Sequence, residues 1–263
     1  MVSRESLTDD VKEFVLEEAD LVGFAPTNRF EGAPQGHGPR DFLPKAKSVI
    51  TFALKLVDPI VDYNKYSPSK IPEESRSMSL VRSLYYEMGH LIQDRLLNFL
   101  AYRTARKLEK MGYKALPMPA TQPGEELRLS GFFGIFSHRH AATRAGLGEF
   151  GFNNLVLTPE FGPRVRLSSV ITEAEFEYDP LISNKICVRE DCNICLKACP
   201  AIKLKVGVDT SKIFINTPST TDVSVCRPTM FSGTPTHEPN ATCIFYGTCM
   251  RVCPVKPQHI NED

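Results

Sequence analysis

The spacing of apolar and polar residues divides the first two thirds of the chain into short strands and helices. The apolar run from Leu21 to Ala25 predicts a short strand, and the β-branched run from Ser48 to Leu54 predicts a central strand that is buried on both faces. Apolar residues recur at helical spacing over about residues 77–111, which predicts a long amphipathic helix that ends at Gly112. This mixture of strands and helices favours an α+β core.

Residues 137–154 predict a short helix followed by a glycine-rich loop. Ser137 is suited to cap the helix, which we expect to end at Gly146. With Gly148 and Gly151, the loop matches the dinucleotide-binding fingerprint as a string, but that fingerprint requires a strand before it and a helix after it. Here the order is reversed, so we exclude a Rossmann site. The glycines are interpreted as positions where the backbone approaches a ligand or another strand closely.

The segment from Arg164 to Thr172 alternates in polarity and predicts a further strand. Arg164 and Arg166 would then lie on the same face of that strand, because side chains alternate between the two faces. Two neighbouring guanidinium groups suit the binding of an anion, and two solvated basic side chains are the alternative.

All eight cysteines lie in the last third of the chain, and they form two groups that each end in Cys-x3-Cys-Pro. This is the pattern of proteins with two 4Fe–4S clusters, in which the last cysteine of each run ligates the other cluster. The first predicted ligand set is Cys187, Cys192, Cys195 and Cys253. The second predicted set is Cys199, Cys226, Cys243 and Cys249. Structural zinc is the alternative, since it also uses closely spaced cysteine pairs.

Composition narrows the possible partners. Lys and Arg together number 31, as do Asp and Glu, so the net charge is zero and gives no support to a role on nucleic acid or a membrane surface. No apolar run approaches the length of a membrane span. Residues 1–10 are polar and acidic and resemble no secretory signal. Together with the reduced thiols, these features predict a cytoplasmic protein.

The chain of 263 residues is long enough for one large domain and one small domain. We expect residues 1–178 to form the α+β core. Residues 179–263 are expected to form a bacterial ferredoxin-like domain that holds the two clusters.

Four stretches, in this order, resemble the superfamily of epoxyqueuosine reductases and reductive dehalogenases, which are cobalamin-dependent enzymes with two 4Fe–4S clusters. They are the strand entry from Leu43 to Ile50, the loop from Ala145 to Asn153, the segment from Pro159 to Thr172 and the cysteine-rich tail. The resemblance implies a nitroreductase-like core and a corrinoid held between that core and the clusters. It also implies electrons from a reduced ferredoxin or flavodoxin, and a small-molecule substrate.

The resemblance also implies roles for individual side chains. The expected cofactor-binding residues lie in the glycine-rich loop and in the strand that follows: Gly146, Gly148, Gly151, Asn153, Arg164 and Arg166. The candidates for proton delivery are titratable side chains expected near the corrinoid: His138, His140 and Tyr85.

Two positions differ from the pattern of the epoxyqueuosine reductases. The register of that family's catalytic Asp falls near Phe132, and Phe152 stands in place of a Lys. These differences argue against chemistry on the queuosine of tRNA. The leading hypothesis is an iron–sulfur reductase that acts on an unidentified substrate at a corrinoid. The alternatives are an electron-transfer protein with two clusters and no corrinoid, or a reductase that contains a flavin.

Overall fold

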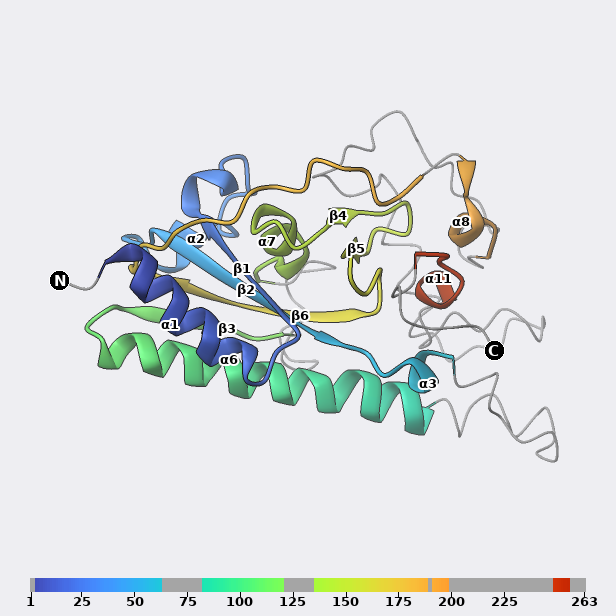
Figure 1. Cartoon of the computed structure of the whole chain (residues 1–263), viewed down its shortest axis with the longest axis horizontal. Coiled ribbons are helices and arrows are strands. Elements are labelled where there is room, and N and C mark those ends of the chain that lie inside the picture. Colours follow the sequence, from blue (N-terminus) through green and yellow to red (C-terminus); the bar gives the residue numbers. More distant parts are fainter. Residues whose placement is uncertain (1–2, 63–81, 121–134, 189–190, 199–247, 256–263) are drawn as a thin grey trace. The chain divides into compact units, whose positions relative to one another are not determined.

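The computed structural model describes residues 3–62, 82–120, 135–188, 191–198 and 248–255 (Figure 1). Helices and strands are mixed along these ranges, which confirms the expected class. None of the helices in the described ranges is long and apolar enough to cross a membrane.

The chain forms two compact units, and each unit is assembled from segments that are far apart in the sequence. Unit 1 consists of Met1–Lys55, Asp94–Glu149 and Val165–Asn184. Unit 2 consists of Leu56–Gln93, Phe150–Arg164 and Lys185–Asp263. The boundary that we expect after residue 178 stays a prediction.

A four-stranded antiparallel sheet forms the centre of unit 1 (Figure 1). The strands, in their order across the sheet, are β1 (Leu21–Pro26), β2 (Ser48–Lys55), β6 (Val165–Thr172) and β3 (Ala115–Met118). β2 pairs on both sides, so that Ile50 lies opposite Phe24 of β1 and opposite Val170 of β6. The expected central strand is therefore confirmed.

Helices cover both faces of this sheet. On one face, Phe24, Ile50 and Phe52 belong to a buried apolar cluster with residues of α1 (Arg4–Leu16) and α6 (Gln93–Lys110). Successive strand residues point to opposite faces, and α7 (His138–Arg144) packs on the other face of β2 and β6. Because both faces are covered, β2 reads as a continuous apolar run rather than an alternating one.

The expected long helix is present in two parts. Its first described part, η3 (Arg82–Ile92), is a π-helix in unit 2, and α6 continues from it. Gly112 has a φ of 91° and ends the helix, as predicted, by donating a backbone hydrogen bond to Glu109 O at 2.9 Å. Residues 77–81 lie outside the described ranges.

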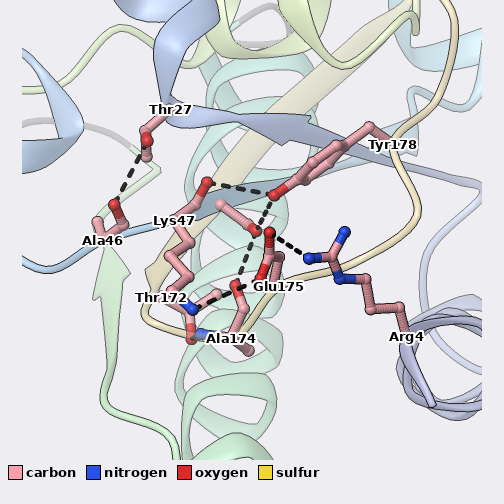
Figure 2. A network of polar contacts seen from close by, with 9 residues as sticks. Arg4, Thr27, Ala46, Lys47, Thr172, Ala174, Glu175 and Tyr178 are labelled. Atoms are coloured by element: carbon pink, nitrogen blue, oxygen red, sulfur yellow. Dashed lines mark hydrogen bonds and ion pairs between the residues drawn. The ribbon is translucent and has the colours of Figure 1, made fainter.

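A polar network holds the segment after β6 in unit 1 (Figure 2). Ser48 Oγ at the start of β2 donates to Ala174 O at 2.7 Å and lies 3.1 Å from Tyr178 Oη. Glu175 forms an ion pair with Arg4 of α1 at 2.7 Å. The segment is thus fixed by buried and partly exposed contacts to β2 and α1.

Unit 2 contains short elements around a small apolar cluster. Besides η3, the helices are α3 (Asp58–Val61), α8 (Ile194–Ala198) and α11 (Thr248–Arg251). The short strand β5 (Val156–Leu157) pairs with β4 (Glu149–Phe150), in which the chain passes from unit 1 to unit 2. The cluster consists of Leu56, Val61 and Met250, with Tyr85 and Leu155 packed against it. It joins segments that precede the cysteine-rich tail to Met250 within the tail.

Candidate iron–sulfur site

A cavity in unit 2 carries four cysteine side chains on its wall: Cys187, Cys192, Cys195 and Cys253. These are all four members of the first predicted ligand set. The first three lie before and within α8, whereas Cys253 follows α11, and α8 and α11 pack against each other. Packing of two short helices thus brings a distant cysteine to the other three. We call this space the cysteine cavity.

The remaining wall of the cysteine cavity is mostly apolar. Its other lining residues are Phe152, Asn153, Leu157, Val188, Asn193, Pro254 and Val255. Phe152 is 2% exposed and Leu157 is 1% exposed, so this side of the wall excludes water. Solvent exposure is one of the factors that set the reduction potential of an iron–sulfur cluster, and an apolar wall keeps that exposure low.

Burial and the neighbouring thiols raise the pKa of two cysteines of the cavity. Burial raises the pKa of Cys195 to about 12, and the thiols of Cys253, Cys187 and Cys192 add to this effect. Burial also raises the pKa of Cys253 to about 11, with contributions from Cys187 and Cys192. Several thiolates in one buried space repel each other unless a cation lies among them, and a thiol that ligates a metal is deprotonated outright.

The donor set fits a metal cluster. Four soft sulfur ligands around one cavity are the ligands of a 4Fe–4S cluster, and structural zinc uses the same donor type. Within the described ranges, no three His, Cys, Asp or Glu side chains are arranged as ligands of a single metal ion. The fit therefore rests on the identity of the four donors and on their position around one space.

The second predicted set falls largely on residues that the structure does not describe. Cys199, Cys226 and Cys243 lie outside the described ranges. Cys249 is described and lies half-buried in α11, in the same helical turn that leads to Cys253. The assembly of the second set stays a prediction.

The end of the glycine-rich loop contributes to the cysteine cavity. Asn153, which lines the cavity, accepts a hydrogen bond from Leu155 N at 3.1 Å and donates one to Cys249 O at 3.4 Å. A Cβ atom on Gly151 would lie 2.8 Å from Asn153 Oδ1 and 2.9 Å from Leu157 Cδ1. Gly151 is therefore required by close packing within unit 2.

The start of the loop is also packed tightly, in unit 1. Gly146 has a φ of 74°, and a Cβ atom there would overlap with Pro180 O. Gly148 is buried. The chain itself fills the spaces beside Gly146 and Gly151, so close packing within the chain accounts for a glycine at both positions. Contact of the loop with a corrinoid stays a prediction.

His138 is a neutral histidine in the interior of unit 1. Its Nε2 lies 2.7 Å from Pro119 O, which only accepts, so Nε2 carries the proton and Nδ1 accepts from Ser169 Oγ at 3.0 Å. Burial lowers the pKa of His138 to about 4, and the positive charge of Arg166 lowers it further, against the opposing effects of the Pro119 carbonyl and Asp94. Both ring nitrogens are engaged by the protein. A role in proton delivery stays a prediction.

The other two candidates for proton delivery lie in different units. His140, in α7 of unit 1, lies 2.7 Å from Ser137 Oγ, and Ser137 caps α7 as predicted. Burial, followed by the charges of Arg144 and Arg139, lowers the pKa of His140 to about 4. Tyr85 lies in η3 of unit 2, where its hydroxyl is 3.8 Å from Met250 Sδ. The structure therefore places Tyr85 and the two histidines in different units.

Both predicted anion-binding arginines pair with carboxylates of the chain itself. Arg164, in unit 2, donates to Asp58 Oδ1 at 2.8 Å and to both oxygens of Asp62 at 3.0 and 3.2 Å. Arg166, in unit 1, donates to Asp94 through Nε at 3.2 Å. Sequence reasoning missed the carboxylates that surround Arg164. The signal was the pair of Asp residues one helical turn apart, directly after the buried strand β2.

Comparison with known proteins identifies the relatives of the chain. No protein-family model matches it. It is 36% identical over 162 residues to a tetrachloroethene reductive dehalogenase of Dehalobacter restrictus. It is also 30% identical over 169 residues to an epoxyqueuosine reductase of Bacillus cereus. These similarities support membership of the chain, as a divergent member, in the superfamily that contains both kinds of reductase.

The chain matches only part of each relative. The matched regions cover 60% of the chain and 23% of the dehalogenase, and 64% of the chain and 39% of the epoxyqueuosine reductase. They thus span less than two fifths of the length of these relatives. The two matches confirm the expected resemblance to these reductases.

Solved structures show that the superfamily fold extends over nearly the whole chain. The structure of epoxyqueuosine reductase from Streptococcus thermophilus has a TM-score of 0.58 at 21% identity and covers 95% of the chain and 66% of that protein. A catabolic reductive dehalogenase has a TM-score of 0.64 at 18% identity and covers 96% of the chain and 32% of that protein. Another epoxyqueuosine reductase, solved with a tRNA stem loop, has a TM-score of 0.55 at 22% identity and covers 97% of the chain and 68% of that protein. At these identities the likeness concerns the fold alone.

Proposed function

We propose that the chain is an iron–sulfur reductase, or the part of one, that passes electrons through two 4Fe–4S clusters to a corrinoid. The observation that supports this most directly is the cysteine cavity, where four cysteines from separate segments line one space. One cluster is held by Cys187, Cys192, Cys195 and Cys253. The second cluster is held by Cys199, Cys226, Cys243 and Cys249.

The protein's own residues have three tasks in this function. They hold the thiols in place, they exclude water from the cavity through Phe152 and Leu157, and they fix the charge around the sulfur atoms. The clusters supply one-electron transfer when they are bound. A reduced ferredoxin or flavodoxin is the proposed electron donor, and a small molecule is the proposed substrate. The nitroreductase-like core and the ferredoxin-like domain belong to the same proposal.

Membership of the superfamily supports a corrinoid as the electron acceptor. The described residues add no support, because the chain itself fills the spaces beside Gly146 and Gly151. This observation favours a second candidate function, in which the chain transfers electrons through two clusters without a corrinoid. A flavin in the core is the third candidate. Both remain compatible with the cysteine cavity.

Anaerobic purification followed by metal analysis tests the proposal. We expect about eight irons and about eight acid-labile sulfides per chain, with tight binding when cobalamin is added. Full iron content without affinity for cobalamin would support the second candidate, electron transfer without a corrinoid. Affinity for flavin in place of cobalamin would support the third candidate. Zinc without sulfide would overturn all three. A tRNA stem loop, the ligand of one related reductase, is titrated in parallel as a candidate substrate.

A further inference from the structure

Arg164 is a buried cation in unit 2, and its Nε atom has no hydrogen-bond partner in the described part of the chain. The residue is 1% exposed and is surrounded by the carboxylates of Asp58 and Asp62. A buried guanidinium group requires such partners, because removing a charge from water is costly. No acceptor in the described part of the chain lies within hydrogen-bonding distance of Arg164 Nε. A buried unsatisfied donor in a native structure requires an explanation.

Gly162, two residues before Arg164, packs against the wall of the cysteine cavity. The backbone at Gly162 lies so close to Val255 O that no Cβ atom would fit between them, and Val255 and Cys253 both line the cavity. Leu56 and Val61, close in sequence to the partners Asp58 and Asp62 of Arg164, form one buried apolar cluster with Met250, three residues before Cys253. Arg164 and its carboxylate partners are therefore packed against the segment that supplies one of the four sulfur ligands.

We propose that Arg164 raises the reduction potential of the cluster held by the cysteine cavity, and that Asp58 opposes this effect. The inference rests on the proposed function, because it concerns a cluster at this site. In each turnover the cluster site accepts one electron from the reduced donor and passes one electron on, and no bond forms or breaks. The added electron brings one negative charge, which a nearby cation stabilises and a nearby carboxylate destabilises.

Two substitutions at this site are expected to have opposite effects. Arg164→Gln removes the cation, leaves the carboxylates of Asp58 and Asp62 in place, and should lower the potential. Asp58→Asn removes one negative charge while keeping an oxygen that accepts from Arg164, and should raise the potential. Arg164→Lys keeps the charge and should stay close to the unchanged protein. A residue that only supports the fold would shift the potential in the same direction, or not at all, in the first two variants.

The test is a one-electron redox titration of the anaerobically purified full chain, followed by EPR spectroscopy, after iron and sulfide have been measured. For Arg164→Gln we expect the ratio of oxidised to reduced cluster, at a given mediator potential, to rise at least tenfold in one of the two clusters. A tenfold change in this ratio corresponds to a reduction potential that is 59 mV lower for a one-electron step. For Asp58→Asn we expect a shift of at least threefold toward the reduced form in the same cluster. For Arg164→Lys we expect less than a threefold shift.

The outcomes separate this inference from the proposed function. A chain without iron and sulfide would overturn the proposed function itself. If the unchanged chain carries its clusters, an unchanged or raised potential in Arg164→Gln would overturn the role of Arg164. If Arg164→Gln loses iron, the Asp58→Asn variant provides the test. An unchanged or lowered reduction potential in Asp58→Asn would overturn the inference.

Discussion

Asn153 Nδ2 donates a hydrogen bond to Cys249 O, with 3.4 Å between the two atoms. The same asparagine lines the cysteine cavity, and its Oδ1 accepts from Leu155 N at 3.1 Å. Both ends of the amide are therefore engaged. One side chain connects the wall of the first predicted cluster site with the backbone of a predicted ligand of the second.

Replacing Asn153 with Asp should remove one of these two hydrogen bonds and keep the other. The carboxylate keeps an acceptor for Leu155 N but loses the donor to Cys249 O, and it adds a negative charge to the cavity wall. We expect the free energy of unfolding to fall by about 1 kcal/mol, the usual net value of one hydrogen bond. The reduction potential of one cluster should fall as well. Anaerobic urea denaturation and redox titration measure the two effects.

Asn153→Ala serves as the control for this substitution. It removes both hydrogen bonds without adding charge, so it should lower stability by about 2 kcal/mol and move the potential less than Asn153→Asp does. Equal potentials in the two variants would show that the side chain does not lie in the electrostatic field of the cluster.

The assignment of cysteines to two crossed sets predicts the results of double substitutions. Cys187→Ser should reduce the iron content from about eight to about four per chain, because it removes one ligand of the first cluster. Adding Cys253→Ser should cause little further loss, since both residues line the same cavity. Adding Cys249→Ser to Cys187→Ser should remove nearly all iron. Iron and sulfide analysis with EPR spectroscopy measures the content.

These double variants control for each other, because each carries two substitutions in the same tail. If the pair Cys187→Ser and Cys253→Ser lost all iron while the pair Cys187→Ser and Cys249→Ser kept half, the assignment of Cys253 and Cys249 would have to be exchanged.

A glycine beside the cysteine cavity should be intolerant of any side chain. Gly162 has a φ of 54°, and a Cβ atom there would overlap with Val255 O, which is backbone and cannot rotate away. We expect Gly162→Ala to destabilise the chain by about 3 kcal/mol, from the overlap and the left-handed backbone together. It should also reduce iron content, because Val255 lines the cavity. Thermal unfolding and iron analysis measure these effects.

Gly32→Ala is the matched control. Gly32 also has a positive φ, of 87°, but no atom lies within 4 Å of the position that its Cβ would occupy. It should therefore lose only about 1 kcal/mol, the cost of the left-handed conformation, and keep its iron. Equal losses in the two variants would contradict the proposed overlap at Gly162.

Because His138 is buried as a neutral group, we expect the free energy of unfolding to decrease in mild acid. Burial lowers its pKa to about 4 in the folded chain, with Arg166 lowering and Asp94 raising it, whereas its unfolded value is 6.5. Between pH 6.5 and pH 4 the histidine is protonated in the unfolded chain but stays neutral in the folded chain. The contribution of neutral His138 to the free energy of unfolding is therefore fully present above pH 6.5 and is lost as the pH falls towards 4. The shift corresponds to about 3 kcal/mol.

His138→Gln should flatten this part of the pH dependence, as measured by urea denaturation between pH 4 and pH 8. The variant loses hydrogen bonds at all pH values, so the comparison concerns the slope and not the absolute stability. His140→Gln is the companion variant, because the pKa of His140 is also lowered to about 4. A slope that stays unchanged in His138→Gln would show that the histidine is not buried as a neutral group.

Local features of the sequence predicted the elements that carry the site. The capping of α7 by Ser137, the end of α6 at Gly112 and the burial of β2 were all predicted correctly, because each depends on neighbouring residues or on the spacing of apolar side chains. The start of the long helix was predicted less well. Its first described part is a π-helix, which the apolar spacing did not indicate.

The partners of the charged residues could not be predicted in this way. Arg164 and Arg166 were expected to share a strand face and bind an anion, whereas each guanidinium group pairs with Asp residues from segments far away in the sequence. His138 was expected near a reacting centre, and the structure places both of its nitrogens on Pro119 and Ser169. Such pairs form because burial leaves a polar group no access to water, and burial depends on how distant segments pack.

By itself, the sequence determined which cysteines stand at cluster spacing, where the strands and helices of the first two thirds lie, and which superfamily the chain resembles. Those features are local, since ligand spacing, capping and periodicity are all set within a few residues. The tertiary structure decided that Phe152 and Asn153 form part of the cavity wall and that a buried arginine pairs with two carboxylates in the same unit. These relationships join segments separated by about a hundred residues, and only the packing of unit 2 brings their charges and apolar surfaces together.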